Sequence, residues 1–105
     1  MSQTATPRRA LSATEVVTQL SKLNGENPQG WRLMDAALEK SFRFKDFHQT
    51  MSFVNAVAFI ANSQNHHPDL SVGYGQCTVR FSTHDVDGIS VSDFLCASKV
   101  DALLI

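Results

Sequence analysis

The sequence predicts an α+β domain in which one four-stranded antiparallel sheet has helices packed on one face, in the order α-β-β-α-β-β-α. Three observations lead to this prediction. Apolar residues recur at helical spacing in three separate stretches of the chain. Between these stretches lie two pairs of short segments in which apolar and polar residues alternate, as in half-buried strands. A short turn joins the members of each pair, so each pair is a hairpin, and hairpins separated by helices favour a single antiparallel sheet.

The first helix is predicted over residues 12–23, and a polar segment at residues 1–11 is expected to form a flexible tail before it. Residues 12–105 then make one domain, as expected for a chain of this length. Ser12-Ala13-Thr14-Glu15 has the form of a capping box, in which the hydroxyl and the carboxylate each accept from the other residue's backbone amide. Asn24-Gly25 ends the helix. Its apolar residues are Val16, Val17, Leu20 and Leu23.

The first hairpin is predicted from a short strand at residues 31–34 and a longer strand at residues 38–44. In the longer strand every second residue is apolar except Lys40, which shares the apolar face. Asp35-Ala36-Ala37 is the expected turn, although it lacks the glycine that such turns favour.

The longest element is a helix that is predicted to run from its N-cap, Asp46, to about residue 64. Its apolar residues form two adjacent stripes, which is typical of a helix packed on two sides. We expect it to lie across the sheet with one flank against another helix. Asn65-His66-His67-Pro68 ends it. The stripes consist of Phe47, Met51, Val54, Ala58 and Ala61, and beside them Phe53, Val57 and Ile60.

The second hairpin is predicted from strands at residues 70–74 and 76–82, with Gly75 at the turn. A polar loop at residues 83–88 follows. Ser90-Val91-Ser92-Asp93 resembles a helix start, and the apolar spacing after it predicts a last helix that reaches Leu104.

Composition and charge exclude several function classes. The content of 43% hydrophobic and 18% charged residues, with a net charge of −1, is typical of a soluble globular protein. No basic run extends beyond Arg8-Arg9, so direct nucleic-acid binding has little electrostatic support. No apolar run approaches the roughly 20 residues that span a membrane, and residues 1–10 lack the apolar core of a secretion signal. Cys77 and Cys96 form no CxxC pair, so we expect two buried thiols in a reducing cytoplasm, with a disulfide between them as the alternative.

Three of the four histidines lie in two short segments at the ends of predicted elements. These segments are Asn65-His66-His67-Pro68 and Ser82-Thr83-His84-Asp85. Side chains at the ends of elements converge easily, and three imidazoles near one cleft can supply an acid, a base and a hydrogen bond to a substrate. One alternative is a pair of solvated loop histidines. A metal site is disfavoured because adjacent residues on an extended backbone point apart.

Both segments belong to a longer set of residues: Gly30-Trp31, Phe44-Lys45-Asp46-Phe47, His66-His67-Pro68, Tyr74, Ser82-Thr83-His84, Gly88 and Asp93. This set resembles the pterin-4a-carbinolamine dehydratases over residues 11–104. The resemblance implies the same fold and assembly into a homodimer or homotetramer. It implies a hydro-lyase that dehydrates 4a-hydroxytetrahydrobiopterin to quinonoid dihydropterin, with no metal or cofactor of its own. Such an enzyme recycles the pterin that an aromatic amino-acid hydroxylase leaves behind.

The resemblance also implies the site residues. The catalytic residues would be His66, His67 and His84, with the first and third flanking the C4a hydroxyl. The backbone of Ser82 and Thr83 would bind the pyrimidine edge of the pterin. The substrate-binding set would be Asn62, Asn65, Pro68, Ser82, Thr83, Asp85, Asp93 and, at the mouth of the pocket, Trp31.

Three residues depart from the family pattern. Asn62 and Asn65 stand where the family often has acids, and Ser92 stands where it often has arginine. An amide accepts a hydrogen bond from an imidazole but does not stabilise an imidazolium as a carboxylate does. We therefore expect activity that is retained but weaker, with histidine pKa values lower than in relatives that have the acids. Residue type alone also allows Trp31 to be a core aromatic and Asp93 to be a helix-start residue.

The alternative function is that of a non-catalytic binding partner on the same fold. Such a protein would act like a transcriptional coactivator, or as an accessory to a pterin or molybdopterin enzyme. The intact set of three histidines favours the enzyme.

Overall fold

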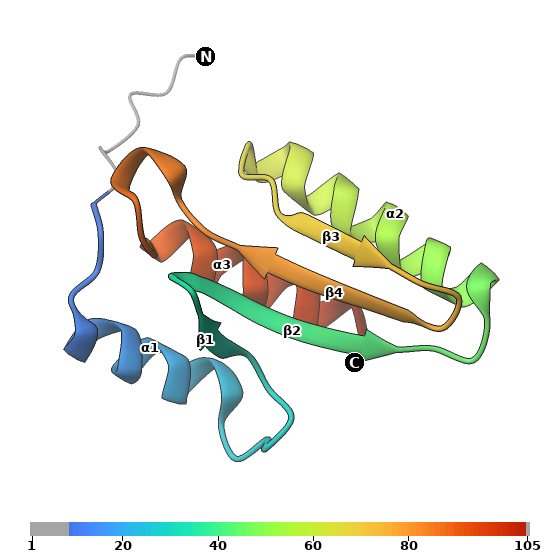
Figure 1. Cartoon of the computed structure of the whole chain (residues 1–105), viewed down its shortest axis with the longest axis horizontal. Coiled ribbons are helices and arrows are strands. Elements are labelled where there is room, and N and C mark those ends of the chain that lie inside the picture. Colours follow the sequence, from blue (N-terminus) through green and yellow to red (C-terminus); the bar gives the residue numbers. More distant parts are fainter. Residues whose placement is uncertain (1–8, 105) are drawn as a thin grey trace.

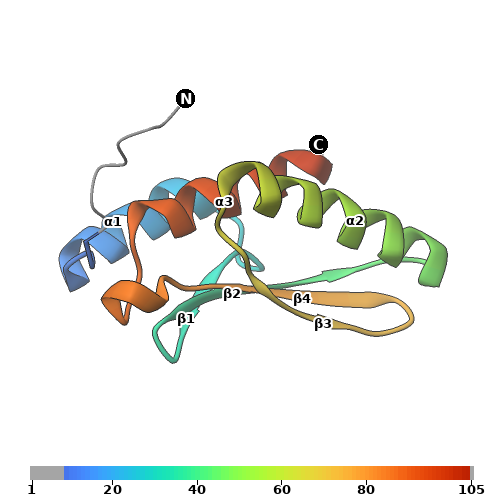
Figure 2. The ribbon, with the colours of Figure 1, turned by 90° about the horizontal axis from the view of Figure 1, so that it is seen from above.

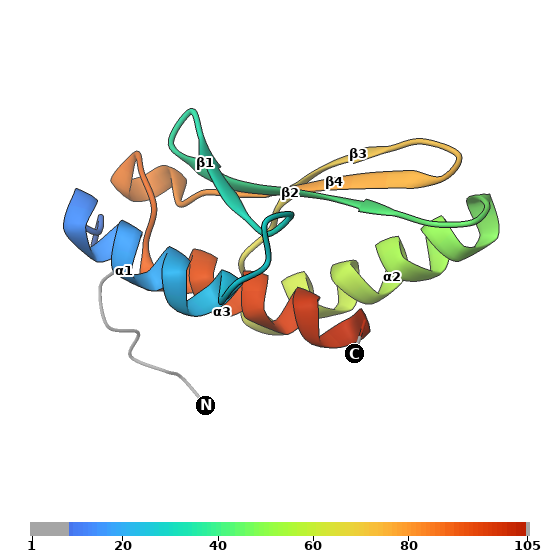
Figure 3. The same ribbon diagram turned by 90° about the horizontal axis from the view of Figure 1, so that it is seen from below.

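The computed structural model describes residues 9–104, and its elements follow the predicted order (Figure 1). All neighbouring strands are antiparallel, and they form one sheet in the order β1-β2-β4-β3. The three α-helices lie on one face of this sheet (Figure 2 and Figure 3). The predicted fold class is therefore confirmed. The elements are α1 (Ala13–Asn24), β1 (Arg32–Met34), β2 (Ala37–Arg43), α2 (Phe47–Gln64), β3 (Asp69–Val72), β4 (Gln76–Phe81), the 3₁₀ helix η1 (His84–Val86), α3 (Val91–Asp101) and the 3₁₀ helix η2 (Ala102–Leu104).

The first two helices begin at the residues that the sequence predicts. The Ser12 hydroxyl accepts from the Glu15 amide at 3.2 Å, and the Glu15 carboxylate accepts from the Ser12 amide at 2.9 Å. The Asp46 carboxylate accepts from the Gln49 amide at 2.8 Å. These bonds satisfy backbone donors that have no partner within the first helical turn.

The segment before α1 is held on the domain. Most of the flexible tail expected over residues 1–11 lies outside the described residues. In the described part, the Arg9 guanidinium donates twice to the Glu15 carboxylate, at 2.8 and 2.9 Å, and the Leu11 amide donates to Ile89 O at 2.8 Å. The hydrogen bonds from Arg9 and then from the cap backbone lower the pKa of Glu15 to about 2.

The turn of the first hairpin consists of two residues rather than three. Asp35 and Ala36 both have positive φ, at 48° and 61°. This left-handed two-residue turn matches the twist of the strands that it joins. Ala37 already belongs to β2, where it pairs with Met34.

The core lies between the sheet and the helices. Cys77, Val79 and Phe81 alternate along β4 and are fully buried. The opposite face of the sheet is polar, and the Ser41 and Thr78 hydroxyls lie 2.8 Å apart across β2 and β4. This one-sided burial is typical of an antiparallel sheet that is covered on one face.

Lys40 lies on the buried face of β2, as the alternation predicts. Its ammonium donates to Asp101 Oδ1 at 2.9 Å and lies 4.9 Å from the centre of the Phe42 ring. The Asp101 carboxylate also accepts from Trp31 Nε1, at 3.1 Å. The end of α3 is thereby tied to the first hairpin.

The two cysteines, Cys77 in β4 and Cys96 in α3, are both buried and form no disulfide with each other. The prediction of two buried thiols is thus confirmed. Burial raises the pKa of the Cys77 thiol.

Helix α2 lies over the sheet and against α3, as predicted. Its apolar arc extends beyond these contacts, because Phe59 is 74% exposed and Phe47 is 48% exposed. Leu103 and Leu104 of η2 are also exposed. Within residues 9–104, no helix has the length and apolar character needed to cross a membrane.

Candidate active site

The two segments that carry His66, His67 and His84 meet at one end of the sheet. β3 and β4 are antiparallel, and Asp69 at the start of β3 pairs with Arg80 near the end of β4. The first segment directly precedes Asp69, and the second begins two residues after Arg80. The register therefore brings the two segments together, where the connection into β3 and the loop after β4 are visible in Figure 1.

His66 forms a buried pair with Asp93. Its Nε2 lies 2.5 Å from Asp93 Oδ1, and the two side chains are 5% and 0% exposed. The His66 ring stacks on Phe81, with ring centroids 6.1 Å apart and planes at 10°. Its backbone amide donates to Ala61 O at 3.1 Å, which fixes the residue directly after α2.

The second oxygen of Asp93 is also occupied. Oδ2 accepts from the Thr83 hydroxyl at 2.7 Å and from the Ser90 backbone amide at 2.9 Å. The Thr83 and Ser90 hydroxyls are themselves 2.7 Å apart. Asp93 is thus fully buried with both oxygens engaged, and it holds His66; its expected part in substrate binding stays a prediction.

This pairing defines the chemistry that is open to His66. The Asp93 carboxylate accepts, so Nε2 of His66 carries the hydrogen. Nδ1 is then the nitrogen at which His66 can take up or release a proton. The same logic applies when a carboxylate fixes the tautomer of a catalytic histidine in other enzymes.

His67 is not part of the buried pair. Its exposed ring places Nε2 3.1 Å from the Asn62 Oδ1 on the last turn of α2. Asn65 ends α2 in the left-handed conformation, with φ at 49°. The two adjacent histidine rings therefore have partners on different elements, α3 for His66 and α2 for His67.

His84 opens η1 and is exposed beside a hollow of about 250 Å³. Ser82 and Thr83 line this hollow with it, whereas His66 and His67 do not. The cleft common to all three histidines therefore stays a prediction. The charged residues of the lining come from four segments and are Asp35, Asp69, Arg80 and Asp87.

Three other residues expected in the site, Thr83, Asp85 and Pro68, do not share one position in the structure. The Thr83 amide donates to Gly88 O at 2.9 Å, and the expected contact of the Ser82 and Thr83 backbone with a pterin stays a prediction. Asp85 is exposed in η1, and Pro68 is half-buried before β3; neither lines the hollow. Among residues 9–104, no three His, Cys, Asp or Glu side chains are grouped so as to hold a metal ion.

Trp31 lies in the core and not at the mouth of a pocket, which corrects the expectation for it. It is 2% exposed, and its ring lies 6.0 Å from those of Phe42 and Phe81. The indole can be buried because its N–H finds an acceptor in Asp101 at the end of α3.

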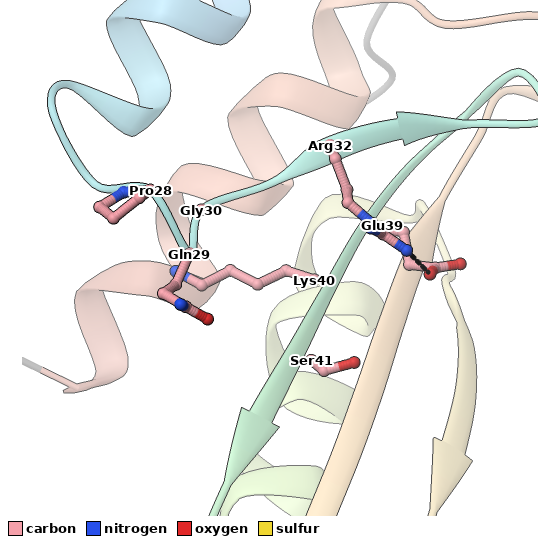
Figure 4. A pocket seen from close by; sticks show the side chains of 7 residues that line it. All are labelled: Pro28, Gln29, Gly30, Arg32, Glu39, Lys40 and Ser41. Carbon is pink, nitrogen blue, oxygen red and sulfur yellow. Dashed lines mark ion pairs between the residues drawn. The ribbon is translucent and has the colours of Figure 1, made fainter.

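A second hollow, of about 220 Å³, lies where the chain enters β1 (Figure 4). Arg32 and Glu39 form an ion pair of 3.9 Å at its edge. None of the residues predicted for the site lines it, so it is separate from the histidine cluster. Its lining consists of Pro28, Gln29, Gly30, Arg32, Glu39, Lys40 and Ser41.

Sequence reasoning missed the part that Ser90 plays in the site. The available signal was the Ser90-x-x-Asp93 spacing, which predicts a helix start and also brings the Ser90 amide to the Asp93 carboxylate. Nothing local in the sequence indicates that Asp35, Asp69 and Asp87 line one hollow, because they belong to three separate segments.

Known proteins resemble this chain over nearly all of its length. A family model described as "Pterin 4 alpha carbinolamine dehydratase" matches residues 9–103. A relative in Paracidovorax citrulli is 57% identical over 101 residues, which cover 92% of this chain and 83% of the relative. A relative in Nitrosomonas eutropha is 46% identical over 99 residues, covering 94% and 81%. Both are named pterin-4-alpha-carbinolamine dehydratase, as an assignment still to be proven.

Two solved structures share the fold. A protein from Brucella melitensis, described as a transcriptional coactivator/pterin dehydratase, has a TM-score of 0.82 and 30% identity, covering 90% of this chain and 98% of that one. A pterin dehydratase-like protein, described as a RuBisCO assembly factor in the alpha-carboxysome, has a TM-score of 0.63 and 24% identity, covering 72% and 90%. The second shows likeness of fold alone. With a family match over residues 9–103 and a relative at 57% identity, the chain belongs to the pterin-4-alpha-carbinolamine dehydratase family.

Proposed function

We propose that the protein dehydrates 4a-hydroxytetrahydropterin to quinonoid dihydropterin by histidine acid–base catalysis. The observation that carries the proposal is the buried His66–Asp93 pair, which fixes the hydrogen of one imidazole nitrogen. His67 and His84 lie in the two segments that meet at the same end of the sheet. Membership of the family supports the choice of substrate.

The reaction needs two proton transfers on one bicyclic ring. The C4a hydroxyl leaves as water once it has accepted a proton, and the N5 proton is lost. The electron pair of the N5–H bond then forms the C4a=N5 double bond. In the proposed site His66 and His84 flank the C4a hydroxyl, and His67 holds or protonates the ring system. Each transfer is worth on the order of 10² to 10⁴ in rate.

The proposal is tested by stopped-flow measurement of the dehydration of 4a-hydroxytetrahydropterin. We expect the wild-type protein to accelerate it, and His66→Ala and His84→Ala each to lower kcat by about 10²-fold or more. His48 is the matched control, because it is exposed near the start of α2, outside the two segments. Equal rates with and without wild-type protein, or a loss in His48→Ala as large as in His84→Ala, would contradict the proposal.

The product gives the protein its place in metabolism. Quinonoid dihydropterin is one reduction away from a tetrahydropterin, so the proposed role is recycling of a tetrahydrobiopterin-type cofactor in the cytoplasm. The reaction class that supplies the substrate is a pterin-dependent hydroxylation, such as that of an aromatic amino acid.

We propose that the chain acts as a homodimer or homotetramer. An apolar groove of about 410 Å³ between α2 and η2 supports this, together with the exposed side chains of Phe59, Leu103 and Leu104. Monomeric proteins seldom leave a large contiguous apolar patch open to water. We call this surface the α2–η2 groove; its lining consists of Phe44, Gln49, Ser52, Phe53, Ala56, Leu103 and Leu104.

The second candidate function is that of a binding partner without catalysis. The description of the Brucella melitensis protein as a coactivator supports it, and so does the same α2–η2 groove, which fits an apolar partner surface. A wild-type protein that does not accelerate dehydration would favour this candidate.

A further inference from the structure

Thr83 is a buried threonine whose hydroxyl and backbone serve the two halves of the proposed site. Its side chain is 1% exposed, and its hydroxyl donates to Asp93 Oδ2 at 2.7 Å. Its amide donates to Gly88 O at 2.9 Å, and its carbonyl accepts from the Val86 amide at 3.2 Å. The side chain therefore contacts the partner of His66, while the backbone shapes the loop that carries His84.

The hydroxyl bonds all run in one direction. A threonine hydroxyl has one hydrogen, and Thr83 gives it to Asp93. The hydrogen in the 2.7 Å contact between Thr83 and Ser90 must then come from Ser90. Two hydroxyls in series thus donate toward one carboxylate, an arrangement in which each bond strengthens the next.

These bonds decide which oxygen of Asp93 faces His66. Thr83 and the Ser90 amide both bind Oδ2, which leaves Oδ1 for His66 Nε2. Without the Thr83 hydroxyl, Oδ2 keeps only the Ser90 amide, and the carboxylate can rotate about its χ2 angle. His66 would then lose its single fixed orientation.

We propose that Thr83 is a positioning residue for the dehydration: its hydroxyl, through its bond to Asp93, holds the His66 ring in one orientation. The proposal rests on the proposed function for its kinetic consequences. A merely structural threonine would stabilise the fold without affecting the His66 ring, so the test needs a readout of that ring.

The experiment uses the full-length protein and three variants. Thr83→Val keeps the shape and removes the hydroxyl, and Thr83→Ser keeps the hydroxyl. Thr83→Ala also removes the hydroxyl, with a smaller side chain, and serves if Thr83→Val does not fold. The matched control is Thr78→Val, because Thr78 also lies on β4 and donates or accepts through its hydroxyl, but on the outer face of the sheet.

Two measurements are made on each protein. Stopped-flow kinetics give kcat, KM and the pH–rate profile. Long-range ¹H–¹⁵N correlation spectra of the histidine rings, with His66 assigned by its absence in His66→Gln, report the hydrogen on Nε2. The spectra do not depend on any substrate.

We expect Thr83→Val to lower kcat by about tenfold or more, a part of the 10² to 10⁴ that a placed acid or base supplies, with KM changed less than about threefold. Its pH–rate profile and its His66 ring signals should both shift. Thr83→Ser should restore all of these, and Thr78→Val should resemble the wild type.

Three results would overturn the proposal: unchanged His66 signals in a folded Thr83→Val or Thr83→Ala protein, a loss of kcat that Thr83→Ser does not restore, and an equal loss in Thr78→Val. If the wild-type protein does not dehydrate the pterin, the proposed function fails. The ring spectra then still decide whether the Thr83 hydroxyl orients His66.

Discussion

Asn24 holds the backbone of Trp31 with both ends of its side-chain amide. Its Oδ1 accepts from the Trp31 amide and its Nδ2 donates to the Trp31 carbonyl, each at 2.8 Å. A Cβ atom on Gly30 would lie 2.2 Å from that Oδ1, so only glycine leaves room for the contact. The last residue of α1 is thereby fixed to the entry of β1.

Loss of this clamp should destabilise the domain. We expect Asn24→Ala to lower the free energy of unfolding by about 2 kcal/mol, since two backbone groups of a buried residue lose their partners at about 1 kcal/mol each. Urea unfolding measures it. Asn27→Ala is the control, because the exposed Asn27 side chain accepts one bond, from the Gln29 amide, and should cost less than about 1 kcal/mol. Equal losses in the two variants would contradict the prediction.

Ala36 has a positive φ of 61° in the first hairpin turn. The left-handed conformation costs a residue with a Cβ atom roughly 1–2 kcal/mol, partly offset by the greater entropy of glycine in the unfolded chain. We therefore expect Ala36→Gly to stabilise the protein by about 0.5–1 kcal/mol, measured by thermal or urea unfolding. Ala37→Gly, at a buried strand position, should destabilise it instead. A loss of stability in Ala36→Gly would show that the turn is not strained.

The ion pair between Arg9 and Glu15 gives stability a defined pH dependence. The pKa of Glu15 is lowered from its ordinary 4.5 to about 2 by the hydrogen bonds from Arg9 and from the cap backbone. A group with a lowered pKa in the folded state stabilises fully above its unfolded value and loses that contribution as the pH falls through the folded value. The stability difference between wild type and Glu15→Gln should thus be constant above about pH 4.5 and vanish near pH 2.

Unfolding curves at several pH values test this prediction. Glu26→Gln is the control. Glu26 lies in the exposed loop after α1, so this variant removes one carboxylate at a position distant from the helix cap. A difference for Glu15→Gln that persists unchanged at pH 2 would rule out the ion pair as its source.

Asn62 contacts His67 through a neutral amide, at 3.1 Å. A carboxylate in its place would stabilise positive charge on the ring, so we expect Asn62→Glu to raise the dehydration rate and to move the pH–rate profile to higher pH. Asn55→Glu adds the same charge at an exposed position of the same helix and is the control. If rate and profile stay the same in Asn62→Glu, the amide is not what limits this site.

The exposed ring of Phe59 continues the stripe of α2 residues that borders the α2–η2 groove. If this surface is covered in an oligomer, Phe59→Glu should disrupt the oligomer. The mass of the assembly, measured by sedimentation velocity or light scattering, should then fall. Val17→Glu, which places a charge on another exposed apolar position, in α1, should leave the mass of the assembly unchanged. A wild-type protein that sediments as a monomer at all concentrations would contradict the proposed assembly.

Features that depend on neighbouring residues in the chain could be predicted from the sequence. The capping box of Ser12 and Glu15, the N-cap Asp46 and the inward side of Lys40 all follow from spacings of a few residues. Each is decided by local geometry, which tertiary packing then leaves in place.

Contacts between distant residues could not be predicted in this way. His66 and Asp93 are 27 positions apart, and Trp31 and Asp101 are 70 apart. Nothing in the sequence indicates that both oxygens of Asp93 accept hydrogen bonds. Nor does it indicate that the Trp31 indole donates to Asp101 at the end of α3. The resemblance indicates Asp93 and Trp31 as site residues. Only the three-dimensional arrangement shows that Asp93 holds His66 and that Trp31 lies in the core.

One carboxylate joins three elements: the end of α2 through His66, the loop after β4 through Thr83, and the start of α3 through Ser90. Until all three have docked, the imidazole has nothing to fix its tautomer. As the protein unfolds, dehydratase activity and tertiary structure should therefore be lost in a single cooperative transition. A partly unfolded intermediate that keeps its helices should have no activity.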